Sequence, residues 1–501
     1  MASFSNLTPF LIRIRPILMS LAILLLLTSI AVVSSGPSKV GTDASRKGST
    51  TDLGNLGAGE IILPDGTIVP ADSPQAAAAR RAAARGSSSA QGGVGGSVAA
   101  AGSLGAGVTV DSIKLGFIVV SNNDKLLSNY GVQGGAIGDT KDQVNAVVND
   151  VNARGGILGR KIVPDIQVWD ATGDPEAQHN QFCARFTQDE KVFAVFSPWN
   201  PPASFPACLA KGKTLFINES LEQQDSETFQ ELSPYLVSGL FSSSRGAVAM
   251  ARALHSQGFF TAGYQLGIVY GNNPMFKRVN DNYFKPTLAS LGVTPFDEFP
   301  ASNAGQAQSA AQRFKDKGVT HVAFVTARGG PPLFFMNFAQ SQTYFPKYGL
   351  ASPDGPVFLA QAAPYTQLRG AMGAGWAPGL DVLDSEGPPY SAAEKRCFDV
   401  HAKAGTNYPS RNEGGTPALM FCDMIWLFEE VAIKAGKTLN TGTWSEALAT
   451  LGTSHQTTIT FGTNFGPGIR DGAYQYRPLA YDDSASCRCF RYTGPEQNVP
   501  R

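Results

Sequence analysis

The stretch 140–170 constrains the fold of this chain more than any other. Within it, Val144, Val147, Val148 and Val151 follow the i, i+3, i+4, i+7 spacing of one apolar helix face. Such a face must be buried against another element, so the helix is expected to pack on a sheet or a second helix.

The ends of this helix and its neighbours are also marked. Thr140 with Gln143 three residues later predicts a capping box at the start, and the Gly-Gly pair at 155–156 predicts the end, because glycine takes the left-handed conformation without strain. Mostly apolar runs at 113–120 and 162–169 predict a strand on either side. The unit is therefore βαβ, which predicts an α/β fold with a parallel sheet.

The end of the helix also carries a family resemblance. Residues 149–162 read Asn-Asp-Val-Asn-Ala-Arg-Gly-Gly-Ile-Leu-Gly-Arg-Lys-Ile and resemble the D-x-N-A-x-GG-I-x-G signature of type I solute-binding proteins. These are the two-lobed receptors of ABC importers related to the leucine/isoleucine/valine-binding protein. The resemblance runs from about Val110 to about Gly494 and implies a type I periplasmic-binding-protein fold. In that fold each lobe is a mostly parallel sheet flanked by helices, and a multi-strand hinge joins the lobes.

The N-terminal region is expected to serve export and tethering. Arg13 and Arg15 precede an apolar run at 17–33, which predicts a signal peptide within 1–35 or, if it is not cleaved, an N-terminal membrane anchor. Residues 36–108 are rich in Gly, Ala and Ser and predict a disordered linker, with a transient hairpin at 61–69 as the alternative.

From residue 109 to 501 strands and helices alternate, which predicts one solute-binding domain. The resemblance divides it into lobe I, about 109–236 and 377–473, and lobe II, about 237–376 and 474–501. Further strands are predicted at 192–196, 214–217, 265–270, 321–325 and 357–360. A long helix at 416–435 is rich in aromatic residues, which we interpret as core.

Six cysteines in an exported chain favour disulfides. Cys183 and Cys208 lie on successive predicted helices that flank one parallel strand, so we expect them to be joined. Cys397 and Cys422 have the same spacing, and Cys487 and Cys489 remain as the third pair. Six cysteines allow 15 connectivities, so these pairs are hypotheses.

Composition argues against several function classes. The formal net charge is zero and only 16% of residues are charged, so no basic surface is expected to bind nucleic acid. The sequence contains no dinucleotide-binding, P-loop, G-x-S-x-G or H-E-x-x-H motif, so we expect neither an enzyme nor a cofactor. The five histidines are scattered and no C-x-x-C pair occurs, so no metal site is expected.

The resemblance implies a ligand site between the lobes, at the carboxyl ends of the strands. Matched to this sequence, its first-lobe residues are Tyr130, Ser197, Pro198, Trp199, Asn218, Glu219 and Ser220. Its second-lobe residues are Tyr270, Asn272, Thr326, Arg328 and Gln361.

Several of these residues allow a second interpretation. Trp199 could pack on the lobe surface instead of stacking on a ligand, Glu219 could cap its loop, and Arg328 could be a solvated rim charge. The first loop lacks the family's serine-rich composition, and Gln361 stands where the family places a carboxylate. Both departures put an α-amino-acid ligand in doubt.

The sequence therefore predicts an extracytoplasmic receptor that captures a small polar or amphipathic solute, amino-acid-like or another small organic molecule. It would deliver the solute to an ABC import permease, and membrane contact would occur only through the N-terminal segment. The alternative is a ligand sensor or scaffold on the same fold without transport.

Overall fold

The computed structural model describes β1 (Glu60–Ile62), β2 (Ile68–Pro70) and residues 103–125, 137–220, 222–325 and 330–500. The chain forms two compact units, Met1–Gln91 and Gly92–Arg501. The predicted signal or anchor segment lies outside the described residues. No helix among the described residues is long and apolar enough to span a membrane.

Two stretches within the predicted linker carry structure. In the first unit β1 and β2 pair antiparallel, with Ile61 opposite Val69, which is the hairpin that the sequence left as an alternative to disorder. In the second unit the N–H of Gly105 donates to the carbonyl of Leu439 at 2.9 Å, so the chain is already held there. The rest of 36–108 lies outside the described residues, apart from 103–108.

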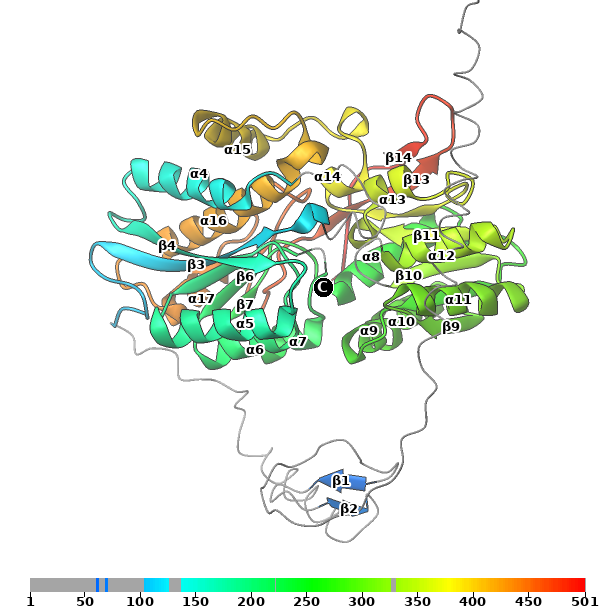
Figure 1. Cartoon of the computed structure of the whole chain (residues 1–501), viewed down its shortest axis with the longest axis horizontal. Coiled ribbons are helices and arrows are strands. Elements are labelled where there is room, and N and C mark those ends of the chain that lie inside the picture. Colours follow the sequence, from blue (N-terminus) through cyan, green and yellow to red (C-terminus); the bar gives the residue numbers. More distant parts are fainter. Residues whose placement is uncertain are drawn as a thin grey trace, which may run out of the picture. The chain divides into compact units, whose positions relative to one another are not determined.

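A five-stranded sheet of wholly parallel strands forms lobe I. In spatial order its strands are β4 (Lys161–Asp170), β3 (Ser112–Ser121), β5 (Ala194–Ser197), β6 (Leu215–Asn218) and β7 (Leu236–Val237). Figure 1 shows helices on both of its faces. One face carries α4 (Thr140–Ala153), α15 (Ala392–Lys403) and α16 (Thr416–Ala435), and the other carries α5 (Pro175–Ala184) and α6 (Ser204–Lys211).

The βαβ unit predicted at 113–169 is present, but a different residue caps its helix. The side chain of Asp139 accepts from the N–H groups of Lys141 and Asp142 at 2.9 and 3.1 Å. Thr140 is already inside the helix, where its hydroxyl donates to the carbonyl of Val120 at 3.2 Å, so the predicted capping box is wrong. Aspartate is as good an N-cap as threonine, and the pattern placed the boundary one residue late.

A mixed eight-stranded sheet forms lobe II. Five of its strands run parallel: β9 (Asp297–Pro300), β8 (Leu266–Tyr270), β10 (His321–Val325), β11 (Lys347–Ala351) and β12 (Met372–Gly375). The closing strands run antiparallel: β13 (Gln475–Asp482), β14 (Cys489–Tyr492) and β15 (Gln497–Asn498). Its helices include α8 (Ser243–Ser256), α9 (Pro274–Arg278), α10 (Lys285–Ser290), α11 (Ala304–Asp316) and α12 (Gly330–Ser341).

The strand predicted at 357–360 is wrong. These residues belong to α13 (Pro356–Ala362), which has proline at its first position after Gly355 in the left-handed conformation. An apolar run of four residues does not distinguish a strand from a buried helix turn. The strand at this place in the sheet is β11, which the sequence analysis missed because Gly349 weakens its pattern.

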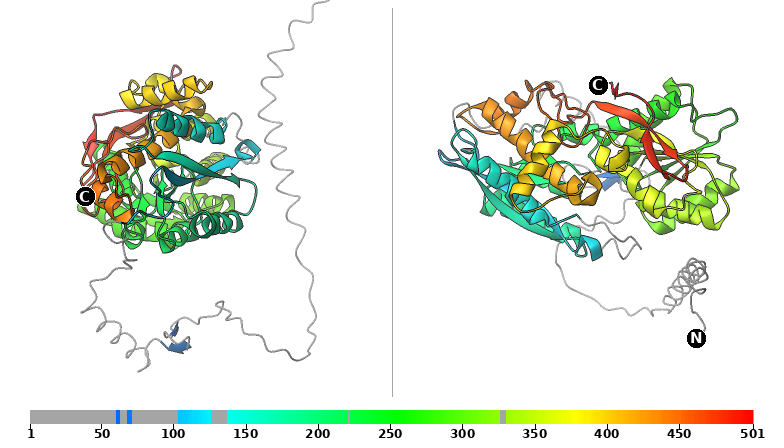
Figure 2. Two further views of the ribbon diagram at one scale, coloured as in Figure 1. Left: turned by 90° about the vertical axis from the view of Figure 1, so that its left-hand side faces the viewer. Right: turned by 90° about the horizontal axis from the view of Figure 1, so that it is seen from above.

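The chain passes between the two lobes three times. The first crossover leads from β7 to α8, the second leads from β12 to α14 (Pro378–Asp381), and the third connects α17 (Thr441–Leu448) to β13. The first and third are joined, because Ser238 donates its N–H to the carbonyl of Arg470 and accepts from the N–H of Gly472, both at 2.8 Å. Figure 2 shows from above that helices late in the sequence, in yellow and orange, lie in the same lobe as the N-terminal part of the domain, in cyan.

The core includes almost the whole length of α16. Phe421, Trp426 and Phe428 are at most 3% exposed, so its aromatic residues are core, as the sequence indicated. Phe428 meets the ring of Phe196 on β5 edge to face at 5.6 Å, which seats the helix against the sheet of lobe I.

Three disulfides join Cys183 to Cys208, Cys397 to Cys422 and Cys487 to Cys489. The first links α5 to α6 with 6.3 Å between the Cα atoms, and the second links α15 to α16 with 6.0 Å. These two disulfides therefore each join two neighbouring helices of lobe I.

We expect removal of the first disulfide to destabilise the protein. Replacing both Cys183 and Cys208 by alanine should lower the free energy of unfolding by about 3 kcal/mol, since the loop between them is no longer closed in the unfolded chain. Denaturant unfolding measures the loss, and peptide mapping without reductant tests the pairing. A free Cys183 thiol in the native protein would contradict this assignment.

Candidate functional site

A pocket lies where the three crossovers meet the carboxyl ends of the lobe II strands, and we call it the hinge pocket. Its cavity volume is about 40 Å³, space for a few water molecules, whereas small-solute sites in proteins have volumes of roughly 300–1,000 Å³. The residues that line it include Gln223, Leu240, Phe241, Ser242, Ser243, Gly246, Ala247, Phe324, Ser352, Trp376, Ala377, Leu380 and Ile459.

The walls of the hinge pocket are mostly apolar. Phe241 from the first crossover and Trp376 from the second meet edge to face, with ring centroids 5.2 Å apart. None of the described residues that line the pocket is charged. A bound solute would therefore meet flat aromatic walls and a few neutral polar groups.

Gln223 supplies the most distinctive polar group. Its amide Nε2 donates to the carbonyls of Asn218 and Ser220 at 3.0 and 2.7 Å, which fixes the orientation of the side chain. Gln223 is 2% exposed, and its Oε1 has no hydrogen-bond partner among the described residues. A buried amide oxygen without a donor is costly, so a solute hydroxyl or N–H would satisfy it.

The N-terminus of α8 also borders the pocket, but its backbone donors are already used. Ser242 and Ser243 donate their N–H groups to Asp471 and to the carbonyl of Gln224, and the Ser242 hydroxyl accepts from the N–H of Arg245. This helix end is therefore capped by the protein and does not present an anion site.

A buried carboxyl group supports the second crossover from behind the pocket. Asp381 is fully buried, and its Oδ2 accepts from the N–H of Ala377 and from the hydroxyl of Tyr492, both at 2.8 Å. Burial raises the pKa of Asp381 to about 7, against hydrogen bonds that lower it. The hydroxyl of Ser352 accepts from the N–H of Trp376 at 2.8 Å, so both groups fix this stretch.

The predicted first-lobe loops come together, as parallel strand ends should. Asn218 donates its Nδ2 to the carbonyls of Ser197 and Trp199 at 2.8 and 3.1 Å, and Ser220 donates its hydroxyl to Oδ1 of Asn218 at 3.0 Å. Pro198 is buried between them. None of these residues lines the hinge pocket, and their polar groups are largely satisfied by one another.

Two predicted residues have other surroundings. Glu219 is fully buried, and a Cβ added at Gly239 would lie 2.6 Å from its Oε1 and 2.9 Å from Oδ2 of Asp423. Its carboxyl group thus faces α16. Trp199 packs partly against the lobe I cluster that contains Phe182 and Phe205. This contact agrees with the second interpretation of Trp199, packing on the lobe instead of stacking on a ligand.

The second-lobe residues are more scattered. Tyr270 is half-buried at the end of β8, and the exposed Asn272 donates its N–H to the hydroxyl of Ser302 at 2.8 Å. Gln361 is exposed on α13 and follows no strand, so the match on which its assignment depended is wrong. Tyr130, Thr326 and Arg328 lie outside the described residues.

Sequence reasoning missed the residues that build the hinge pocket. Phe241 and Ser242 follow β7, a strand that was not predicted, so the rule that located Ser197 and Asn218 did not reach them. Ser352 follows β11, which was not recognised, and Trp376 follows the glycine-rich β12.

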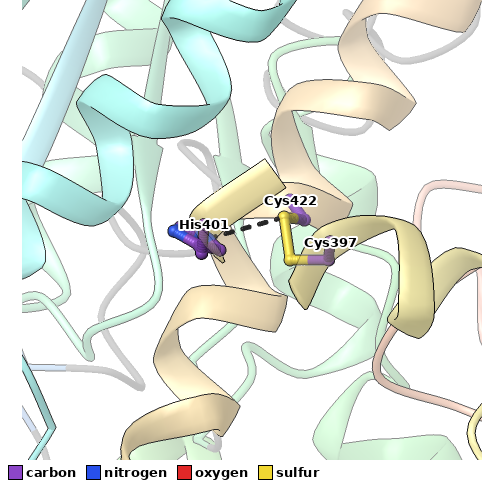
Figure 3. A group of neighbouring side chains, drawn as sticks. All are labelled: Cys397, His401 and Cys422. Carbon is purple, nitrogen blue, oxygen red and sulfur yellow. Dashed lines mark hydrogen bonds between the residues drawn. A yellow bond between two sulfur atoms is a disulfide. The ribbon is translucent and has the colours of Figure 1, made fainter. Parts of the chain in front are cut away.

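Cys397, His401 and Cys422 form a buried group in which one ligand atom from each residue lies within 4.8 Å of the others (Figure 3). Nε2 of His401 lies 3.8 Å from Sγ of Cys422. The two cysteines are joined to each other, and a disulfide offers no thiolate to a metal ion. Burial lowers the pKa of His401 to about 4, so its imidazole is neutral and the group is structural.

Comparison with known proteins identifies the family. Residues 128–417 match the family model described as "Periplasmic binding protein". The chain therefore belongs to the periplasmic binding protein family, whose members bind solutes outside the cytoplasm and are not enzymes. No curated protein matches the chain.

Solved structures share the fold at low sequence identity. A substrate-binding protein from Aeropyrum pernix is 12% identical, with a TM-score of 0.58 over 78% of this chain and 96% of that one. A solute-binding protein from R. palustris in complex with 4-hydroxybenzoate is 15% identical, with a TM-score of 0.56 over 78% and 98%. A branched-chain amino acid transporter protein from Thermus thermophilus with bound valine is 13% identical, with a TM-score of 0.55 over 77% and 97%.

An ion pair at the hinge provides a test of this geometry. Nη1 of Arg245 lies 3.2 Å from Oδ2 of Asp471 and donates to the Asp471 carbonyl at 2.8 Å, and both side chains are at most 14% exposed. Removing one partner of such a pair leaves a poorly solvated charge. Arg245→Met should therefore lower the free energy of unfolding by about 3 kcal/mol.

Arg313→Met is the matched control, since Arg313 pairs with Asp297 while 45% exposed. We expect it to cost less than about 1 kcal/mol in the same denaturant experiment. Equal losses for the two variants would contradict the role given to Arg245.

Proposed function

We propose that this protein captures a small solute between its two lobes, closes on it, and delivers it to an ABC import permease. The position of the hinge pocket is the main support for this proposal. All three crossovers contribute to its wall, through Phe241, Trp376 and Ile459, so a change in the angle between the lobes would reshape it directly. A solute that fits only one of these shapes would select that state.

The solute we propose is small and largely apolar, with a ring or branched chain and one hydrogen-bond donor. The ring or chain would lie between Phe241 and Trp376, and the donor would meet Oε1 of Gln223. A free ammonium and carboxylate would both lack partners in this pocket, and burying an unpaired charge is expensive. Any charged group of the solute would therefore face the open side, as could the carboxylate of a 4-hydroxybenzoate-like molecule.

The loops matched to the family's site extend this proposal toward the facing edges of the lobes. We retain Ser197, Pro198, Trp199, Asn218 and Ser220 as one rim. Tyr270, Asn272, Thr326 and Arg328 would form the other, with Tyr130 covering the solute. Glu219 belongs to neither rim, because its carboxyl group faces Asp423 on α16.

Two further assignments are also proposals. The permease would recognise the closed pair of lobes, and the N-terminal segment 1–35 would direct export and, if retained, anchor the protein to the membrane.

A thermal-shift experiment tests the solute class. 4-Hydroxybenzoate and L-valine serve as first probes, because a ligand that binds only the native state raises its stability, by about 2.7 kcal/mol at a hundred times Kd. We expect 4-hydroxybenzoate to raise the melting temperature more than L-valine at equal concentration. A larger shift with L-valine would contradict the neutral pocket.

Filling the pocket should abolish this shift. Ala247 lines the hinge pocket on α8, and Ala247→Leu would occupy space there, weakening binding at least tenfold, or about 1.4 kcal/mol. Ala289→Leu makes the same change at an exposed position of α10 and should bind as the wild type does. Unchanged binding by Ala247→Leu would exclude the hinge pocket as the site.

A further inference from the structure

Four titratable residues from three distant segments lie in a row behind the hinge pocket. Glu219 follows β6, Asp423 and Glu430 lie two turns apart on α16, and His455 lies on the third crossover. The side chains of Asp423 and His455 are fully buried, as is Glu219, whereas that of Glu430 is 39% exposed. The row therefore runs from the interior to the surface.

The contacts along this row are direct. Nδ1 of His455 lies 3.0 Å from Oε2 of Glu430, and Nε2 lies 3.4 Å from Oδ2 of Asp423. An imidazole with a carboxylate oxygen within 3.4 Å of each nitrogen is stabilised as an imidazolium by the two negative charges. Burial alone would lower the pKa of His455, but Asp423 and Glu430 outweigh it and raise it to about 9.

The carboxyl group of Glu219 is the unusual member. It faces Asp423 across Gly239 and forms no ion pair in the described part of the chain. Burial raises the pKa of Glu219 well above its ordinary value, and the charge of Asp423 raises it further. Two carboxyl groups buried side by side hold one proton between them, since both cannot ionise without a second cation. Asp423 keeps its charge because His455 faces it, so the proton resides on Glu219.

Two residues of the row contact the backbone of the first and third crossovers, which form part of the pocket wall. Gly239, beside the Glu219 carboxyl, comes directly before Leu240, which lines the pocket. Oδ1 of Asp423 accepts from the N–H of Thr458, and the next residue, Ile459, also lines it. The first and third crossovers thus both rest on the Glu219–Asp423 pair.

We propose that Glu219, Asp423 and His455 form a proton-sharing chain that positions the wall of the hinge pocket, so that solute binding requires one retained proton between the two carboxyl groups. The requirement of this proton for solute binding rests on the proposed function, whereas the existence of the proton-sharing chain does not. Loss of the proton would leave two adjacent buried anions, which would push the crossovers apart and disrupt the wall. Glu219, Asp423 and His455 are positioning residues. The titratable group that faces Glu219 is Asp423, and those that face His455 are Asp423 and Glu430.

The sign of the pH dependence follows from the raised pKa of Glu219. The native state keeps a proton that the unfolded chain releases above about pH 4.5, the ordinary value for glutamate. The wild type therefore loses stability as the pH rises through the interval between the unfolded and folded pKa values. His455 acts in the same direction, since its contribution is present below pH 6.5 and is lost as the pH rises through about 9.

Melting curves without solute test the chain directly. Glu219→Gln keeps the shape of a protonated carboxyl and still donates to Asp423, so its melting temperature should match the wild type near pH 4.5 and exceed it by a margin that grows with pH. His401→Gln, a change at a buried histidine outside the chain, should leave the slope of the wild-type profile unchanged above about pH 6.5, where this imidazole is neutral in the native and the unfolded chain alike. A Glu219→Gln profile parallel to that of the wild type would overturn the proposal.

Infrared spectroscopy provides a second measurement, which reports the protonation state of the carboxyl group and not the stability of the protein. At neutral pH the protein should show the C=O stretch of a buried protonated carboxyl group that Glu219→Gln lacks, distinct from any due to Asp381. A spectrum in which Glu219→Gln removes only an ionised carboxylate would contradict the chain.

The effect on binding is measured with benzyl alcohol, a neutral ring with one hydroxyl donor that does not titrate in this range. The wild type should bind it at least tenfold more weakly at the highest pH at which it stays folded than near pH 6.5, and Glu219→Gln should lose less than threefold over the same range. If the two proteins weaken equally, the positioning role is wrong. If neither protein binds benzyl alcohol at any pH, the proposed solute class is wrong. The melting profiles alone then decide whether the proton-sharing chain exists.

Discussion

The joining of the first and third crossovers is the contact on which the rest of the structure depends. Two hydrogen bonds link Ser238 to Arg470 and Gly472, and the ion pair of Arg245 with Asp471 lies directly beside them. Without this contact the carboxyl ends of the two sheets would have no fixed relation. With it, the ends of β6 and β7 and those of β10 and β11 border one space, which is where parallel sheets bind ligands.

The hinge pocket separates charge from the space that a solute would occupy. Its wall is aromatic and neutral, while the ionisable groups stand one layer behind, with Asp381 under the second crossover and Glu219 with Asp423 under the other two. Each of these carboxyl groups is buried, and each accepts from or faces backbone that leads into the wall. The arrangement fixes the wall by hydrogen bonds without placing a charge beside an apolar solute.

Local sequence signals predicted much of the fold. The valine face of α4 and the bounds of α16 could be derived, because each signal acts within a few residues of the chain. Resemblance to the family added the two-lobed plan, which periodicity alone does not contain. The misassigned stretch 347–362 lacked such a signal, because Gly349 interrupts the strand and Pro356 begins a helix that is too short to show a period.

The candidate site was less predictable, since it depends on how distant segments meet. Sequence position placed Glu219 at a strand end, but only α16 and the third crossover reveal that its side chain turns away from the pocket. Closure of the lobes around the hinge pocket is the central claim, and small-angle X-ray scattering tests it most directly. With a saturating concentration of a solute that raises the melting temperature, the radius of gyration should fall for the wild type. It should stay constant for Ala247→Leu at the same concentration. A stabilising solute that leaves the wild-type radius unchanged would contradict the account.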